Sequence, residues 1–234
     1  MNMMKSFHAL LLALFASFNA LMIYLFILHL PFGFDPLVAS FQHWARLSPR
    51  IEIALTIAAV VAVVGLVLVN RIGDGWKNSL TYLKGDRSHP AASVFFTARK
   101  QPFETNDLLQ AFPAIKEAAF APQVQLQVWE SLYKKHADNA LIASTRAYWH
   151  LIRDLYLLSM LFVATFLIVW PFNGSIPLQL VLPYIFVFGA QFLFLMIGAR
   201  GIGFRFVDNV LASELGLGIG QNALKEKQQG KSRR

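Results

Sequence analysis

The stretch from residue 155 to residue 198, LYLLSMLFVATFLIVWPFNGSIPLQLVLPYIFVFGAQFLFLMIG, contains no Lys, Arg, Asp or Glu. A helix needs roughly 20 mostly apolar residues to cross the ~30 Å hydrocarbon core of a bilayer, so this stretch is long enough for two helices. Asn173 and Gly174 place a strong turn signal in its middle. The long apolar runs lack the alternation of a membrane barrel strand. The sequence therefore predicts a helical membrane hairpin.

Two further windows of this kind lie at 9–30 and 53–70, beside the pair at 155–172 and 176–198. Only 15% of the residues are charged, whereas a soluble domain carries about 25%. Backbone groups in lipid must form hydrogen bonds within their own segment, which favours helices. We expect an all-α, polytopic integral membrane protein with four transmembrane helices in two hairpins and a helical cytoplasmic insert between the second and third helices.

The first window shares two features with a secretory signal peptide, namely Lys5 and the apolar residues 10–14. The apolar run continues to Leu30, which is longer than a usual signal core. Phe18 and Ala20 also make a poor small-x-small cleavage pair. We therefore expect this window to be an anchor that is retained.

Basic residues near the ends of the windows predict the orientation, because cytoplasmic loops are enriched in Lys and Arg. One side would hold eight of them: Lys5, Arg71, Lys77, Lys84, Arg146, Arg153, Arg200 and Arg205. The other side would hold Arg46 and Arg50. This bias predicts that both termini lie in the cytoplasm, and the compact size and simple topology favour a bacterial inner membrane. Trp44 and Trp170 would lie in the outer aromatic belt, and Trp76 and Trp149 in the inner one.

The expected domains follow the chain in five parts: a first hairpin at 1–72, the cytoplasmic insert at 73–150, a second hairpin at 151–200, a cytoplasmic helix at 201–220 and a disordered basic tail at 221–234. The insert begins with a loop-like segment at 85–106. A helix from Asp107 should break at Pro113, because proline cannot continue a helical hydrogen-bond ladder. Helical spacing predicts a second helix at 124–136 and a third that starts near Asn139 and continues into the third membrane span.

Small residues follow one face of each of the first two membrane helices: Ala9, Ala13, Ala16 and Ala20 on the first, and Ala54, Ala58, Ala62 and Gly65 on the second. Small residues at this spacing let membrane helices approach closely. Two interpretations stay open, packing of the two helices within one subunit and a subunit interface in a homo-oligomer.

No Lys, Arg, Asp or Glu lies within the four windows, which argues against a proton-coupled transporter. Asn19 and Gln191 are the candidates for hydrogen bonds between membrane helices. Gly198 ends the last window, and Gly201 and Gly203 follow it. These glycines predict a hinge there.

A basic cluster is expected at the cytoplasmic ends of the helices, formed by Arg71, Arg146, His150, Arg153, Arg200 and Arg205. Residues 146, 150 and 153 are spaced to share one helical face. The cluster has two interpretations. The arginines can extend to lipid headgroups at the membrane surface, or they can bind an anionic ligand.

Catalytic signatures are missing from the sequence. There is no cysteine, no HExxH pairing and no phosphate-binding loop. We therefore expect neither an enzyme nor a bound cofactor or metal. The expected partners are membrane lipids, especially the anionic inner leaflet, further copies of the chain and a cytoplasmic partner protein. Nucleic acid is disfavoured because the basic tail lacks interleaved aromatic residues.

These features favour a homo-oligomeric membrane component whose cytoplasmic domain senses a ligand or docks a partner, and whose helices anchor the assembly or form a pore. By analogy alone, a bacterial defence effector or sensor has this plan. A small channel or transporter for a neutral or anionic solute is the main alternative. A membrane enzyme acting on lipid is a further alternative, and it would require Asp154, His150 and Asp208 to be buried together.

Overall fold

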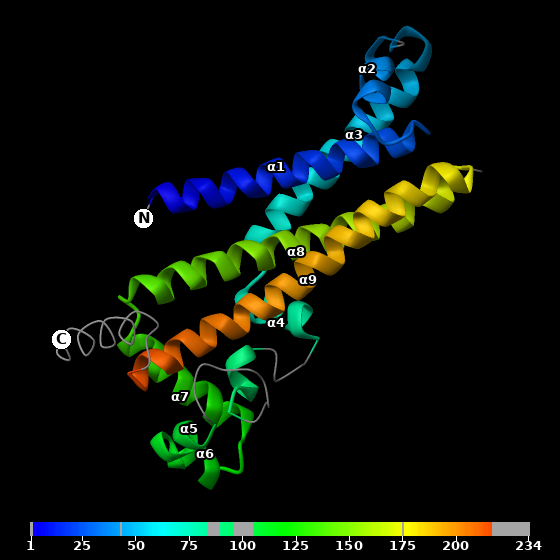
Figure 1. Ribbon diagram of the computed structural model, residues 1–234. Helices are drawn as coiled ribbons and strands as arrows, with labels where there is room; N and C mark the ends of the chain where they lie inside the picture. The colour runs from blue at the N-terminus through cyan, green and yellow to red at the C-terminus, as the bar shows by residue number, and fades with distance from the viewer. Residues whose placement is uncertain (1, 43, 84–88, 96–104, 175, 217–234) are drawn as a thin grey trace, which may run out of the picture. The chain divides into compact units, whose positions relative to one another are not determined.

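The computed structural model describes residues 2–42, 44–83, 89–95, 105–174 and 176–216, apart from the side chains at 2–5, 41 and 44–48. All regular structure in these residues is helical, which confirms the predicted all-α class (Figure 1). Four segments are long and apolar enough to cross a membrane: Ser6–Ile27, Pro49–Arg71, Ala140–Phe172 and Leu178–Glu214. The prediction of a multi-pass membrane protein is confirmed at this level.

The elements of the described chain, in order, are α1 (Asn2–Ile27), α2 (Phe34–Gln42), α3 (Trp44–Arg71), α4 (Asp74–Tyr82), the 3₁₀ turn η2 (Pro90–Ser93), α5 (Thr105–Ala111), α6 (Pro113–Glu117), α7 (Pro122–Lys135), α8 (Ala140–Phe172) and α9 (Leu178–Glu214). They form two compact units. The first unit comprises Met1–Gly73 and Leu151–Ile197, and the second comprises Asp74–His150 and Gly198–Arg234. Helices α8 and α9 each contribute residues to both units.

In the first unit, α1 and α8 run in the same direction, as two pairs of contacts establish. At one end the His8 Nε2 atom lies 3.2 Å from the Asp154 Oδ2 atom. At the other end the His29 Nε2 atom lies 2.9 Å from the Asn173 carbonyl oxygen. The two pairs are roughly 30 Å apart along each helix at a rise of about 1.5 Å per residue, which matches the thickness of a bilayer core.

The core of the first unit is centred on Phe26 of α1. Its ring centroid lies 4.7 Å from that of Phe166 on α8 and 5.2 Å from that of Tyr184 on α9. The Phe166 ring also lies 5.2 Å from the Phe188 ring. Offset and edge-on aromatic pairs contribute about 0.5–1.5 kcal/mol each beyond their burial. These pairs join α1, α8 and α9 within the first unit.

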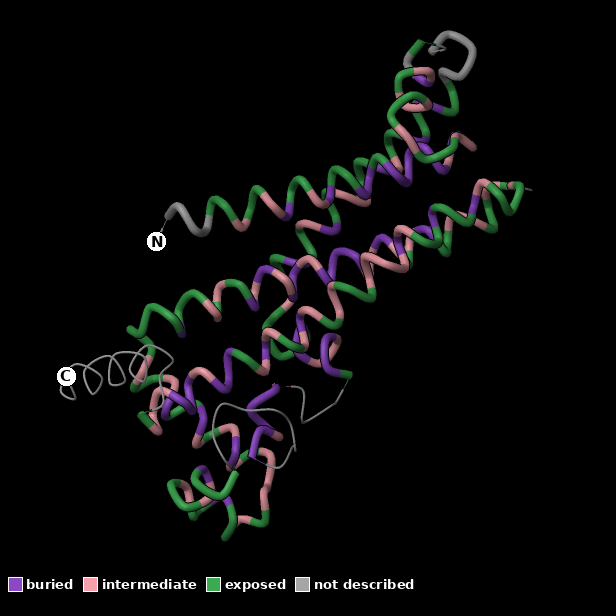
Figure 2. The backbone as a smooth tube through the Cα atoms, viewed as in Figure 1, coloured by how far each residue is buried: buried purple, intermediate pink, exposed green. Residues whose placement is uncertain are grey.

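The small residues of α1 and α3 are divided by burial. Ala16 and Ala20 are buried, as are Ala54 and Ala58, in the core where α1 packs on α3 (Figure 2). A methyl group at Gly65 would lie 2.8 Å from the Leu161 Cδ2 atom, so α8 packs closely on α3 at that point. Packing within one subunit accounts for these small residues.

Three of the small residues on the first two membrane helices differ from this pattern. Ala9 and Ala13 are exposed and Ala62 is half-buried. An interface between copies of the chain stays a prediction for these positions.

The second unit has an aromatic core built on the last turns of α9. Phe206 lies 5.3 Å from Trp129 of α7 and 5.5 Å from Trp149 of α8, measured between ring centroids. Val207 and Val210 are fully buried beside it. Trp149 is therefore a core residue, and its expected place in the inner aromatic belt is wrong.

Several boundaries differ from those expected. The break at Pro113 is present, with α5 ending at Ala111. Helix α3 begins before the window predicted at 53–70 and contains Pro49, and membrane helices tolerate such a proline. Helices α2 and α4 were not predicted. The expected tail at 221–234 and most of the loop at 85–106 lie outside the described residues.

Helix α9 continues without interruption through Gly198, Gly201 and Gly203. Gly203 has a packing reason, because a methyl group there would overlap the Tyr82 hydroxyl and lie 2.7 Å from the Trp149 Nε1 atom. Packing of α4 and α8 on this glycine offsets the ~1 kcal/mol that each glycine costs a helix. Bending at the three glycines stays a prediction.

We predict that Gly203→Ala lowers the free energy of unfolding by about 1–3 kcal/mol, because the added methyl group overpacks the second unit. Gly201→Ala is the matched control, since a methyl group at Gly201 meets nothing within 4 Å. The control should be neutral or stabilising by up to ~1 kcal/mol. Thermal unfolding of both variants in detergent checks the prediction, and equal stability of the two would contradict it.

Candidate functional site

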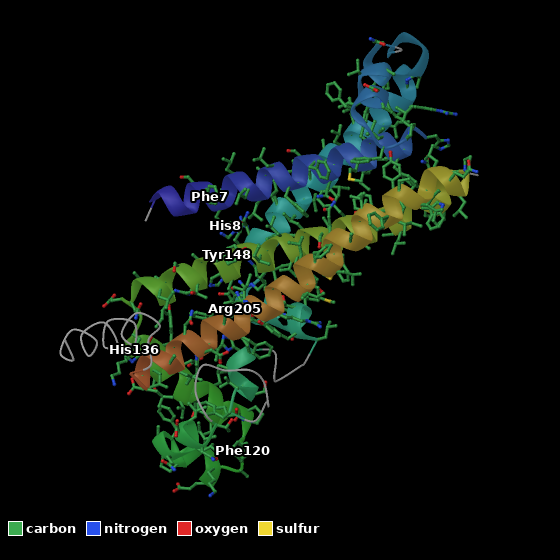
Figure 3. All side chains as sticks on the ribbon, viewed as in Figure 1. Phe7, His8, Phe120, His136, Tyr148 and Arg205 are labelled. Atoms are coloured by element: carbon green, nitrogen blue, oxygen red, sulfur yellow. The ribbon has the colours of Figure 1, made fainter. Side chains whose placement is uncertain are left out.

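The first unit holds a cluster of ionisable side chains, formed by His8 on α1 and by Arg153 and Asp154 on α8. The Asp154 carboxylate lies 3.2 Å from the His8 Nε2 atom and 4.0 Å from the Arg153 Nε atom. Arg153 is only 1% exposed and Asp154 only 6%. His8 is half-buried and lies near the beginning of α1 (Figure 3). We refer to these three residues as the buried ionic cluster.

The position of the buried ionic cluster explains how it is tolerated. Asp154 and His8 are each roughly 30 Å along their helix from the opposite end of the bundle. They would therefore lie where the hydrocarbon core ends, and not at its centre. Burial of a charge is costly unless it is paired, and loss of one partner of a buried pair is strongly destabilising.

The chemistry available to the cluster is that of a carboxylate beside an imidazole, which can share or transfer a proton. Among the described residues, no group of three or more His, Cys, Asp or Glu side chains is placed to hold a metal ion. The cluster therefore has the groups for an ion pair that ties α1 to α8.

The opposite end of the first unit is closed by hydrogen bonds. The Asn173 side-chain amide donates to the Phe26 carbonyl at 3.1 Å, and the Tyr184 hydroxyl donates to the Leu30 carbonyl at 2.7 Å. His29 contacts the Asn173 carbonyl in return. The last carbonyls of a helix have no partner within it. The Phe26 carbonyl accepts from the His29 backbone N–H as well as from Asn173, and Tyr184 binds the chain just beyond the end of α1.

The asparagine and glutamine within the membrane spans do not form the bond expected between helices. The Asn19 amide donates to the Phe15 carbonyl of its own helix at 2.9 Å. Within the described part of the chain, the Asn19 Oδ1 and Gln191 Oε1 atoms accept no hydrogen bond. An unsatisfied buried acceptor costs about 1–3 kcal/mol.

The predicted basic cluster is divided between the two units. Arg71 and Arg153 belong to the first unit, whereas Arg146, His150, Arg200 and Arg205 belong to the second. Arg71 is exposed at the end of α3, and Arg205 is exposed on α9 (Figure 3).

Arg146 and Arg200 in the second unit tie different helices together. The Arg146 guanidinium donates to the Tyr133 hydroxyl on α7 at 2.8 Å and lies 5.4 Å from that ring centroid. The Arg200 Nε atom donates to the Thr81 carbonyl on α4 at 2.8 Å. His150 is half-buried beside the Trp149 ring. Anion or headgroup binding by the basic cluster stays a prediction.

A third polar contact joins the ends of α7 and α9. The Glu214 carboxylate lies 2.8 Å from the Lys135 Nζ atom and 2.6 Å from the His136 Nε2 atom (Figure 3). Exposed or partly exposed ion pairs contribute about 0–1 kcal/mol each. The contact fixes the C-terminal end of α9 to the second unit.

The sequence indicated Arg153 as a candidate site residue but did not indicate the contact between Asp154 and His8 beside it. His8 and Asn173 are the functional residues that it missed, because their partners lie far away in the chain. Asp154 beside Arg153 at the start of an apolar run was the available signal for a buried charge pair.

Comparison with known proteins gives no relative. No protein-family model, no curated protein and no solved structure matches this chain. The function must therefore be argued from the residues and their arrangement.

We predict that His8 and Asp154 are energetically coupled. In a double-mutant cycle of His8→Ala and Asp154→Asn, the coupling free energy should be about 1–3 kcal/mol, as for residues that share a buried polar contact. A cycle of His8→Ala with the exposed residue Asp138→Asn is the control and should be additive within about 0.5 kcal/mol. Unfolding in detergent measures both cycles, and additivity in the first would show that the two side chains act independently.

Proposed function

We propose that this protein is a membrane component in which the first unit crosses the bilayer four times and the second unit lies in the cytoplasm, where it senses a ligand or docks a partner protein. A change in the second unit would be passed to the first through α8 and α9. The first unit would then anchor the assembly or open a pore.

The continuity of α8 and α9 carries the proposal. These helices have 33 and 37 residues, which corresponds to roughly 50 and 55 Å against ~30 Å for the bilayer core. Phe206 of α9 packs in the core of the second unit, and Phe188 of the same helix packs in the core of the first. No loop separates the two positions, so a shift of α9 at one end acts on both cores.

The distribution of Lys and Arg supports the orientation. Eight basic residues near the span ends would face the cytoplasm and two would face the other side, as cytoplasmic enrichment of Lys and Arg requires. Under this proposal both termini lie in the cytoplasm, and the membrane is a bacterial inner membrane. A bacterial defence effector or sensor is one class of protein with such a plan.

The polar contacts inside the first unit favour an anchor over a channel for polar solutes. The Ser159 hydroxyl donates to the Tyr156 carbonyl and the Thr165 hydroxyl donates to the Leu161 carbonyl, each within its own helix. A continuous path for a polar solute requires polar groups that face a shared passage. Any pore would thus need several copies of the chain.

Homo-oligomerisation is the part of the proposal that a mass measurement tests. The expected result for the detergent-purified protein is a detergent-subtracted particle mass that is a multiple of 26.3 kDa, with Ala9 and Ala13 on the exposed face of α1 as the candidate interface. Ala13→Leu should then reduce the particle mass, and Ala59→Leu on the exposed side of α3 should not. A particle of one chain in wild type would exclude the homo-oligomer and leave a partner protein as the second component.

A further inference from the structure

Helix α4 has a reversed distribution of polar and apolar side chains. Its buried residues are Lys77, Asn78, Thr81 and Tyr82. The face formed by Trp76, Leu80 and Leu83 is apolar, and Trp76 is 74% exposed and Leu83 71% exposed. Trp76 and Leu80 are spaced i and i+4, so they share one side of the helix. Leu83 follows directly after the last residue of α4. A helix in water normally shows the opposite pattern.

The buried side of α4 is held within the second unit. The Thr81 carbonyl accepts the hydrogen bond from Arg200, and the Tyr82 ring lies 5.9 Å from the Phe204 ring. The close approach of the Tyr82 side chain to Gly203 adds a third contact with α9. These contacts orient the helix, so the apolar face is exposed because the other face is committed to α9.

The connection to α3 limits what can cover the apolar face. Helix α3 ends at Arg71 and α4 begins at Asp74. Three Cα–Cα steps span no more than about 11 Å. The interfacial zone on each side of a ~30 Å hydrocarbon core is about 5–8 Å deep. If α3 crosses the bilayer, α4 begins in or beside the headgroup region.

We propose that α4 is an interfacial helix whose Trp76–Leu80–Leu83 face inserts into the lipid headgroup region of the leaflet in which α3 ends. Tryptophan is enriched at this depth because its ring is apolar and its N–H group is polar. An amphipathic helix at this depth buries its apolar side at the boundary between headgroups and acyl chains. This inference rests on the proposed membrane insertion of α3. It adds that the second unit is held against the membrane surface by α4.

Site-directed spin labelling tests this proposal, and the absence of native cysteine makes single-cysteine variants direct to prepare. Trp76→Cys and Leu83→Cys would each carry a nitroxide in vesicles of phosphatidylethanolamine and phosphatidylglycerol. Collision rates are measured with oxygen, which concentrates in lipid, and with a water-soluble nickel chelate. Both positions should show an oxygen-to-nickel ratio several-fold above that of Glu130→Cys, an exposed control on α7.

Val63→Cys separates failure of this inference from failure of membrane insertion. Val63 is exposed in the middle of α3, and its label should read the lipid interior. A lipid signal at Val63→Cys with an aqueous signal at Trp76→Cys and Leu83→Cys would overturn the interfacial helix alone. Low collision rates with both reagents at 76 and 83 would also overturn it, because a protein surface would then cover the face. An aqueous signal at Val63→Cys would overturn the insertion of α3 itself.

Discussion

Backbone hydrogen bonding in the absence of water is the constraint on which the first unit depends as the proposed membrane-spanning bundle. Each N–H and C=O group in hydrocarbon needs a partner from its own helix or from a neighbour. Along the spans the helical ladder supplies that partner. At the end of α1 the ladder stops, and Asn173 and Tyr184 bond the carbonyls of Phe26 and Leu30 from other helices. At the other end the His8–Asp154 pair joins α1 to α8. Polar contacts therefore hold the bundle together at both ends, and Phe26 and its aromatic neighbours add apolar packing near the end where α1 stops.

The second unit depends on a different kind of packing. Its core is built from aromatic rings on α7, α8 and α9, with the Phe206 ring in contact with both Trp129 and Trp149. Arg146 donates a hydrogen bond to Tyr133 on α7, and Arg200 donates one to the Thr81 carbonyl on α4. These two side chains therefore connect neighbouring helices of the second unit. Helix α9 thus contributes to the core of the first unit and also to the core of the second. This shared helix is the physical basis for the proposed transmission between a cytoplasmic event and the membrane.

Much of the fold was predictable, because the length of an apolar run and the position of a proline act locally. The four spans and the break at Pro113 follow from these local signals. The continuity of α9 through Gly203 was not predictable, because close packing against Tyr82 and Trp149 outweighs the low helix propensity of glycine. Helix α4 was missed because its apolar residues lie on its exposed side. The pairing of His8 with Asp154 joins residues far apart in the sequence, and no local pattern indicates it.

The most direct test of the account is the side of the membrane on which each end of α8 lies. Phe172 is exposed at one end of this helix and Ser144 is exposed near the other. A membrane-impermeant maleimide added to intact bacterial cells should label Phe172→Cys at once. It should label Ser144→Cys only after the inner membrane is permeabilised. Equal labelling of both variants in intact cells would contradict a crossing by α8, and with it the four-span arrangement on which the proposed function rests.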